Sequence, residues 1–277
     1  FRFFKKYKKW DYPKNTNLKL LDEYPKIFFY FKKVIWVDEI LDFKDNKNNN
    51  ILCNSTKLKY LSDNINYIGK HNILIVAGSD YKLSNCIEYI DKINNYFKII
   101  YFEAKDICYK NVKMIPMGLN FAYTLRNGGD ENILKIINRD NLPKSELVTT
   151  AFGSKWIGLN KTIKARIDLI KFCQDKDWLI KNNWTPDEYY KELSKYKYFI
   201  CPTGNGIQAP KIFESLLVKT IPIVLNLSGF QDIKSYGYPI LIINNYEELN
   251  PSMLDNLYKT EFKNIDWDKI IYDLTIE

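Results

Sequence analysis

The stretch from residue 198 to residue 225 contains the groups of this chain that could bind a phosphorylated ligand. The apolar run 198–201 leads into a loop with two glycines, and Pro210 then occupies a position typical of the first turn of a helix. Helix N-termini present unpaired backbone N–H groups and a positive partial charge, which together attract anions. Lys211 adds a cation to this turn, and Glu214 follows one turn later, within reach of a ribose diol beside a bound diphosphate. The pattern predicts an anion site, while a solvated helix position is an equally good interpretation of Glu214.

Histidine and cysteine content excludes several other chemistries. His71 is the only histidine among 277 residues, which excludes a His-rich metal centre and routes any Ser-His-Asp or Cys-His mechanism through one position. The five cysteines are an odd number without a C-x-x-C pair, a pattern that favours reduced thiols over a disulfide framework or a zinc site. The loop at residues 202–208 matches neither a Walker A motif nor a G-x-G-x-x-G fingerprint. Any chemistry is therefore expected to use carboxylates.

The charge balance is basic but carries no nucleic-acid motif. Lys and Arg outnumber Asp and Glu by 41 to 33, a net charge of +8, and only four of the basic residues are Arg. Residues 1–10 interleave aromatic and basic side chains, yet no zinc finger or ribonucleoprotein signature accompanies them. No apolar run approaches the roughly 18 residues of a membrane-spanning helix. We expect a soluble protein with mostly surface lysines and no nucleic-acid partner.

Short β-branched runs alternate with helical patterns along the chain, which predicts an α/β fold with parallel sheets covered by helices. In the first half, strands are expected within residues 26–37 and at 73–77, 98–102 and 112–120, with a helix at 84–96. In the second half, strands are expected at 147–152, 198–201 and 221–225, with helices at 162–173, 185–195 and 210–219 and a last one near 253–272. The polar stretch 121–146, with Gly128, Gly129 and Pro143, is the best candidate for an interdomain region.

Several motifs of the second half resemble a known family. The segments P-T-G-N-G, K-I-F-E-S-L and T-I-P-I-V, which begin at Pro202, Lys211 and Thr220, resemble the donor-binding domain of the exostosin-like glycosyltransferases, inverting enzymes of GT-B architecture. The segment P-M-G-L from Pro116 is similar to the turn that closes their amino-terminal domain, and the segment around Arg166 is similar to one with a diphosphate-contacting Arg. The resemblance covers about residues 110–245, is weak before residue 70, and says little about the sugar.

The resemblance implies a function and a donor site. It implies a metal-independent, inverting transfer of a sugar from a UDP-sugar, such as UDP-xylose or another UDP-hexose or UDP-pentose, to a hydroxyl of a glycan acceptor, without a required cofactor. Glu214 would hold the ribose. The remaining donor-site residues implied by the resemblance, which surround the diphosphate, are Gly153, Ser154, Arg166, Pro202, Thr203, Gly204, Asn205, Gly206 and Lys211. A surface cation is the competing interpretation of Arg166. The alternative function is a non-catalytic α/β module that binds glycans or polyanions through its basic amino terminus.

An inverting transfer also needs a base that takes the proton from the acceptor hydroxyl, commonly a carboxylate or His. In open parallel sheets ligands gather at the carboxyl ends of the strands. His71 precedes the strand 73–77 and so lies at its wrong end, whereas Asp80 follows that strand in a G-x-D segment similar to one in the family. Asp80 is the first candidate, with a helix N-cap as its competing interpretation. The same logic gives Asp38, Glu39 and Glu103 as alternatives.

The implied architecture is GT-B-like, with two Rossmann-like α/β domains facing a central cleft. We expect an acceptor-side domain at 1–145, a nucleotide-sugar-binding domain at 146–255, and a terminal helix at 256–277 that returns to the first domain. Two D-x-D strings begin at Asp175 and Asp266, but neither follows an apolar run that would make it a metal-binding strand end. Free cysteines and the Lys, Asn and Ile bias favour a cytoplasmic enzyme of a large DNA virus or an AT-rich microbe.

Overall fold

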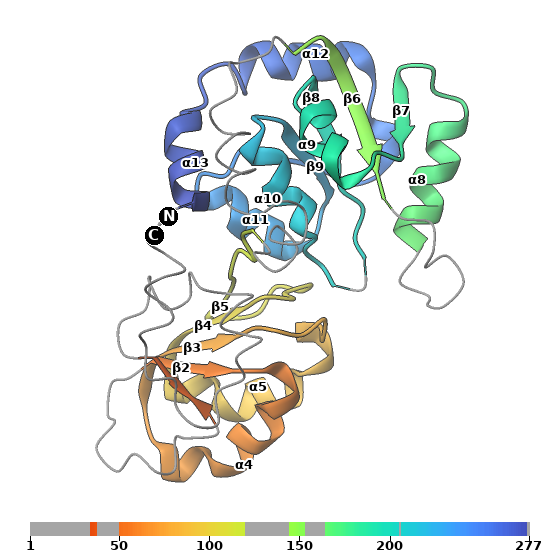
Figure 1. The fold of residues 1–277 in the computed structure, drawn as a ribbon. Coiled ribbons are helices and arrows are strands. Elements are labelled where there is room, and N and C mark those ends of the chain that lie inside the picture. Colours follow the sequence, from red (N-terminus) through yellow and green to blue (C-terminus); the bar gives the residue numbers. More distant parts are fainter. Residues whose placement is uncertain (1–33, 38–49, 120–143, 153–163, 205, 276–277) are drawn as a thin grey trace. The chain divides into compact units, whose positions relative to one another are not determined.

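The computed structural model describes residues 34–37, 50–119, 144–152, 164–204 and 206–275 (Figure 1). The chain divides into a first unit, Phe1–Ala122 with Glu277, and a second unit, Tyr123–Ile276. This division falls inside the polar stretch predicted to separate the two halves. Because residues 120–143 are not described, the exact domain limits stay predictions.

The first unit contains a five-stranded parallel sheet whose strands lie in chain order. The strands are β1 (Val34–Trp36), β2 (Asn50–Cys53), β3 (His71–Val76), β4 (Phe97–Phe102) and β5 (Val112–Met114). The helices are α4 (Leu58–Ile68) and α5 (Ile87–Ile93), with 3-10 turns η2 (Ser55–Lys57), η3 (Leu83–Asn85) and η4 (Asn94–Tyr96). α4 contacts α5 (Figure 1). Right-handed crossovers between strands that follow one another in chain order place their helices on the same face of the sheet.

The second unit contains another five-stranded parallel sheet, in the order β10-β9-β8-β6-β7. Its strands are β6 (Glu146–Ala151), β7 (Leu179–Asn182), β8 (Tyr196–Ile200), β9 (Ile221–Leu225) and β10 (Leu241–Ile243). The chain runs from β6 outward to β7, returns to β8 on the other side of β6, and continues in that direction. The strand order therefore reverses between β6 and β8, which is the place where open α/β sheets bind ligands.

Helices cover both faces of this second sheet. They are α8 (Lys164–Gln174), α9 (Pro186–Leu193), α10 (Pro210–Leu217), α11 (Ser228–Ser235), α12 (Pro251–Thr260) and α13 (Trp267–Thr275), with the 3-10 turn η6 (Tyr246–Glu248). On one face, Leu169 and Phe172 of α8 and Leu254 of α12 pack with strand residues in one apolar cluster. On the other face, the Phe199 ring of β8 meets the Tyr189 ring of α9. Burial on both faces explains the nearly continuous apolar runs of β8 and β9.

The α/β class and the parallel strands are confirmed, and several details differ. The start of α9 is confirmed: Pro186 is its first residue, and Thr185 forms a capping box with Glu188. The single helix expected near residues 253–272 is wrong, because the chain leaves α12 after Thr260 and starts α13 at Trp267. The Asp266 carboxylate accepts the backbone N–H of Lys269 and so caps this second helix. α13 contacts α10 of the second unit, and its return to the first domain stays a prediction.

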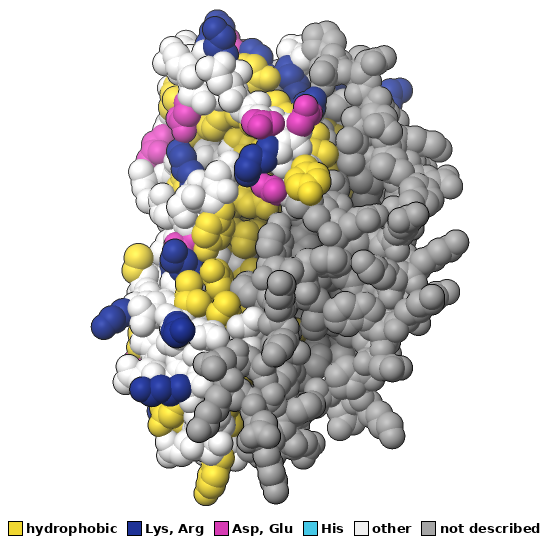
Figure 2. All heavy atoms as spheres, turned by 90° about the vertical axis from the view of Figure 1, so that its left-hand side faces the viewer, with side chains coloured by type: hydrophobic (Ala, Val, Ile, Leu, Met, Phe, Trp, Pro, Cys, Tyr) yellow, Lys and Arg dark blue, Asp and Glu magenta, His cyan; other side chains and the backbone are white. Residues whose placement is uncertain are grey.

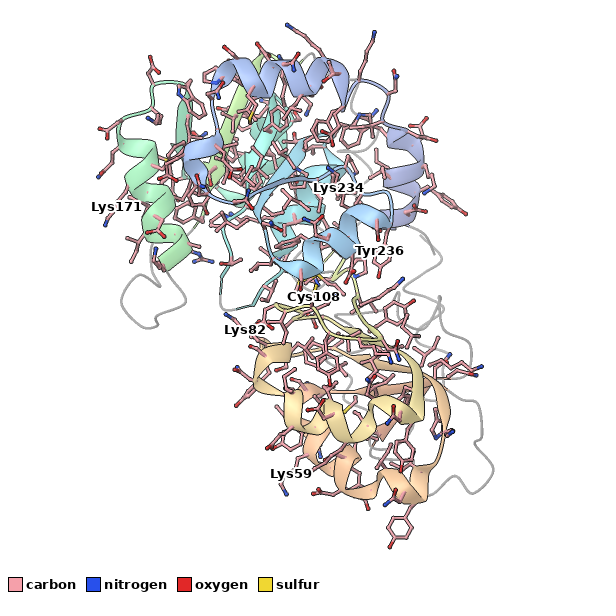
Figure 3. The ribbon with its side chains drawn as sticks, turned by 180° about the vertical axis from the view of Figure 1, so that it is seen from behind. Lys59, Lys82, Cys108, Lys171, Lys234 and Tyr236 are labelled. Atoms are coloured by element: carbon pink, nitrogen blue, oxygen red, sulfur yellow. The ribbon has the colours of Figure 1, made fainter. Side chains whose placement is uncertain are left out.

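Surface lysines account for much of the basic charge in the described ranges. Figure 3 shows Lys59 and Lys171 pointing away from the ribbon, and Figure 2 shows dispersed Lys and Arg side chains on the described part of one face. Within those ranges, no helix is both long enough and apolar enough to cross a membrane.

Lys144 is an exception among the lysines because it is largely buried at the entrance to β6. Its Nζ donates to the carbonyls of Ser194 and Val218, at 2.8 and 2.7 Å, and to Thr220 Oγ1 at 2.8 Å. Ser194 and Val218 are the C-cap residues of α9 and α10, so one ammonium serves the carboxyl ends of two helices. Burial lowers the pKa of Lys144 to about 7.

Replacing Lys144 by Met should destabilise the second unit by about 3 kcal/mol at pH 10, because two part-buried carbonyls lose their donor. The destabilisation should be smaller at pH 7, because the lowered pKa of Lys144 shows that the buried ammonium itself costs stability there, and Met removes that cost. Denaturant unfolding followed by tryptophan fluorescence would measure the change. Lys195→Met is the matched control: Lys195 pairs only with the nearby Glu192 and is half-exposed, so its loss should cost less than about 1 kcal/mol. Equal stability of the two variants would contradict the role given to Lys144.

Candidate functional site

The carboxyl ends of β6 and β8 bring the predicted anion-binding residues of the second unit together. α10 begins at Pro210, as predicted, and its N-cap residue Ala209 provides no side-chain cap for the first-turn N–H groups. Lys211, in this first turn, donates from Nζ to the carbonyl of Ala151, the last residue of β6, at 2.6 Å. This hydrogen bond joins the first turn of α10 to the end of β6, where the strand order reverses.

Arg166 of α8 lies against the loop that follows β8. A Cβ atom added to Gly204 would stand only 2.9 Å from Arg166 Nη2, so the absence of a side chain makes room for the guanidinium. The guanidinium carbon lies 5.9 Å from the ring centroid of Phe152. Arg166 Nε is buried and has no hydrogen-bond partner, and no ion pair to Arg166 occurs among the described residues. The arrangement leaves a fork of donors ready for an anion.

Glu214 is 0% exposed, so the interpretation of it as a solvated helix residue is wrong. It is one of six consecutive buried residues of α10, Ile212–Leu217. Neither carboxylate oxygen has a hydrogen bond of ordinary geometry among the described residues. Burial raises the pKa of Glu214 to about 7, against the opposing effects of the Lys211 ammonium and the Tyr189 hydroxyl. A buried carboxyl with few local partners is a typical feature of functional sites.

Lys211 is the centre of this charged group. Burial lowers its pKa, the Glu214 carboxylate opposes that shift, and the Arg166 guanidinium adds a smaller lowering effect. The Lys211 ammonium also lies 5.2 Å from the ring centroid of Tyr189. Lys211 therefore interacts electrostatically with both Arg166 and Glu214, as expected of residues that share one site.

The other predicted donor-site residues divide into two groups. Pro202 is buried, and Thr203, Gly204 and Gly206 are half-buried in the loop after β8. Three predicted residues lie outside the described part of the chain: Gly153, Ser154 and Asn205.

Three residues near this site were not predicted from the sequence: Phe152, Tyr189 and Lys181. Phe152 lies directly after β6 and is 7% exposed. Lys181 belongs to β7, a four-residue strand that has only two apolar residues and therefore gives little periodic signal. Tyr189 could have been found from its place on the apolar side of the predicted helix at 185–195.

In the first unit, Asp80 lies just beyond the carboxyl end of β3. It is not the cap of a helix: the N-cap residue of η3 is Lys82, and the Asp106 carboxylate accepts the backbone N–H of Ser84 in that turn. Asp80 is exposed and its carboxylate has no hydrogen bond or ion pair to any described residue. Partial burial of the carboxyl raises the pKa of Asp80, the direction that a general base requires.

The turn that carries Asp80 is held on both sides of Gly78. The Gly78 N–H donates to Glu103 Oε2 at 2.7 Å, and the Gly78 carbonyl accepts from Asn54 Nδ2 at 2.9 Å. Gly78 has φ +79°, a conformation that favours glycine. Glu103, one of the predicted bases, is buried and accepts the hydrogen bond from Gly78, so its role is structural.

Other predicted positions have the following outcomes. His71 begins β3 at the amino-terminal end, as expected, and its Nε2 lies 3.0 Å from the carbonyl oxygen of Ile68. Asp38 and Glu39 lie outside the described residues.

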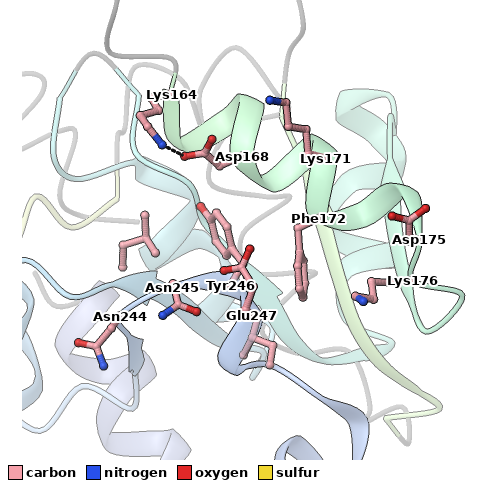
Figure 4. Close-up of a pocket in the computed structure, with 12 residues that line it drawn as sticks. Lys164, Asp168, Lys171, Phe172, Asp175, Lys176, Asn244, Asn245, Tyr246 and Glu247 are labelled. Carbon is pink, nitrogen blue, oxygen red and sulfur yellow. Dashed lines mark hydrogen bonds and ion pairs between the residues drawn. The ribbon is translucent and has the colours of Figure 1, made fainter.

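A separate pocket of about 740 Å³ lies between α8 and the segment that follows β10 (Figure 4). The side chains of Phe172 and Tyr246 lie in its interior, and Lys164 pairs with Asp168 at one side. Three Lys and three carboxylates line it, so its charges balance and it offers no net attraction for a diphosphate. The charged group around Lys211 is therefore the better candidate site.

No cluster of three or more potential metal ligands occurs in the described ranges. Asp175 and Asp177 are exposed in the turn after α8, and Asp266 and Asp268 are exposed around the start of α13. Neither D-x-D string lies at the carboxyl end of a strand.

Comparison with known proteins leaves the family open. Neither a protein-family model nor a curated protein sequence matches this chain, so the resemblance to the exostosin-like glycosyltransferases stays a prediction.

Proposed function

We propose that the protein is a GT-B glycosyltransferase that transfers a sugar, with inversion, from a UDP-sugar to a hydroxyl of a glycan. One observation carries the proposal: Arg166 Nε and both carboxylate oxygens of Glu214 are buried without hydrogen-bond partners of ordinary geometry. Both residues act electrostatically on Lys211, which is hydrogen-bonded to Ala151 at the reversal point of the second sheet. Ligands of open α/β sheets bind at this point, and unpaired buried polar groups favour a polar ligand.

The proposed donor site follows from the charge that develops in the reaction. As the glycosidic bond to the diphosphate breaks, negative charge grows on the leaving group, and preorganised cations stabilise that charge. Arg166 would bind two phosphate oxygens, and Lys211 with the uncapped start of α10 would add a point charge and backbone donors. In this proposal the cations take the role that a divalent metal has in other transferases.

Glu214 would accept hydrogen bonds from the ribose hydroxyls. Because its side chain is 0% exposed, contact with the ribose requires the side chains above it to move when the nucleotide binds. Asp80 would act as the base toward the acceptor, since its carboxylate is exposed and has no role in the described fold.

Calorimetric titration with UDP tests the donor site. The wild-type protein should bind UDP, and Gly204→Ala should weaken binding about tenfold, because the added methyl displaces the Arg166 guanidinium while the flexible side chain spares the fold. Gly237→Ala is the control: Gly237 has φ +91° and nothing within 4 Å of an added Cβ, so this change strains the backbone and lowers stability without altering affinity.

Failure of the wild-type protein to bind UDP would overturn the proposal. It would favour the alternative function, a non-catalytic α/β module for glycans or polyanions. Equal UDP affinity of Gly204→Ala and wild type would remove Arg166 from the site.

A further inference from the structure

Phe152 is shared by two cations from different elements. Its ring centroid lies 5.9 Å from Arg166 Cζ and 5.1 Å from Lys181 Nζ. Phe152 directly follows β6, and Lys181 pairs in register with Thr150 near the carboxyl end of the neighbouring strand β7. Lys181 thus lies at the same edge of the sheet as the candidate donor site.

No acidic side chain neutralises these two cations in the described part of the second unit. The ion pairs found there use other lysines, namely Lys164, Lys195, Lys197, Lys234 and Lys269. The Lys211 ammonium increases the local positive charge, since Arg166 lowers its pKa through like-charge repulsion. The Glu214 carboxylate acts on Lys211, whereas Arg166 and Lys181 form no ion pair with a described residue. A bound anion would supply the counter-charge that these two cations lack.

The Phe152 ring attracts both the Arg166 guanidinium and the Lys181 ammonium. A cation over an aromatic face is attracted by the quadrupole of the ring. Phe152 is 7% exposed and therefore held by packing, so its ring gives Lys181 and Arg166 a common fixed contact. Lys181 is exposed and belongs to the same end of the sheet as Arg166, so its ammonium is accessible to an anion bound there.

We propose that Lys181 binds the second phosphate of a nucleoside diphosphate, with Arg166 and Lys211 on the first, so that the site distinguishes diphosphates from monophosphates. This inference rests on the proposed donor site, and it adds a residue and a selectivity to it. The class of donor that follows is a nucleoside diphosphate sugar rather than a nucleoside monophosphate sugar.

Titration of wild type and Lys181→Gln with UMP, UDP and inorganic pyrophosphate tests the proposal. Wild type should bind UDP more tightly than UMP. Lys181→Gln should lose about fivefold in affinity for UDP and pyrophosphate, but less than twofold for UMP. The matched control is Lys176→Gln. The Lys176 ammonium lies 5.5 Å from the ring centroid of Phe172, so this variant also removes one positive charge from a cation–ring contact. Unlike Phe152, Phe172 has no contact with an Arg guanidinium among the described residues. Lys176→Gln should bind all three ligands as wild type does.

The three ligands separate the two proposals. If Lys181→Gln weakens UMP and UDP equally, or neither, while wild type binds UDP, the role of Lys181 is wrong and the donor site stands. If wild type binds pyrophosphate through Lys181 but not UDP, the diphosphate site stands and the UDP-sugar function fails. If wild type binds none of the ligands, both proposals are overturned.

Discussion

Asp80→Asn should lower the turnover of the UDP-sugar by roughly 10²–10⁴-fold, the usual contribution of a general base, while UDP affinity changes less than about twofold. Asparagine has nearly the same shape but cannot take a proton from the acceptor hydroxyl. Because the Asp80 carboxylate has no contact that supports the described fold, the substitution should leave stability nearly unchanged. Release of UDP from a panel of UDP-sugars with glycan acceptors would measure turnover, and calorimetry would measure affinity.

Asp63→Asn is the matched control for this prediction. Asp63 is an exposed carboxylate of α4 in the same unit, paired with Lys59 at 3.2 Å, and lies outside the turn that carries Asp80. Its loss should not affect turnover. Near-normal rates in Asp80→Asn would eliminate Asp80 and leave Asp38 and Glu39 as candidates for the base.

Glu214→Gln should have opposite effects on stability and on nucleotide binding. In the folded protein, burial raises the pKa of Glu214 from 4.5 to about 7. The folded state therefore binds more protons than the unfolded state between these values, and the contribution of Glu214 to stability falls as pH rises through this window. Gln cannot ionise, so the stability of the variant relative to wild type should increase by up to about 3 kcal/mol between pH 5 and pH 8.

Nucleotide binding should change in the other direction. A ribose hydroxyl bound to a carboxylate contributes about 1.5–3 kcal/mol, so Glu214→Gln should weaken UDP binding by about 10- to 100-fold at pH 8. Denaturant unfolding at pH 5 and pH 8, with calorimetry at pH 8, would measure both effects. Glu247→Gln, which removes an exposed carboxylate of η6, is the control and should alter neither.

The two measurements distinguish the possible roles of Glu214. A variant that is stabilised at pH 8 and still binds UDP normally would show that Glu214 only balances the charge of Lys211. A stability difference that does not depend on pH would contradict the burial of an ionisable carboxyl at this position.

Local features of the sequence were sufficient to predict the framework of the candidate site in the second unit. The apolar run of β8, the glycine-containing loop and Pro210 predicted a strand, a loop and a helix start, and all three are confirmed. The apolar neighbours Phe213 and Leu217 also show in hindsight that Glu214 faces the interior. The complete burial of Glu214 depends on contacts with other elements of the fold, which the local sequence does not reveal.

Contacts between distant parts of the chain could not be predicted in the same way. The Gly78 turn depends on Glu103, 25 residues away, and neither residue carries a local signal of that hydrogen bond. The position of Lys181 depends on the pairing of β7 with β6, and β7 is too short and too exposed for periodicity to reveal. Side-chain roles that arise from sheet pairing therefore require the structure.

The chain-order arrangement of β1 to β5 has a consequence for how the first unit can evolve. Its described strands do not reverse direction along the sheet, so that edge has no topological crevice to shape a ligand site. Asp80 instead belongs to a turn whose backbone is held at Gly78 and, further along, at Leu83, whose N–H donates to the carbonyl of Ala104. The exposed residues between these two points, Asp80 and Tyr81, can then change without altering the hydrogen bonds that hold the turn to the sheet.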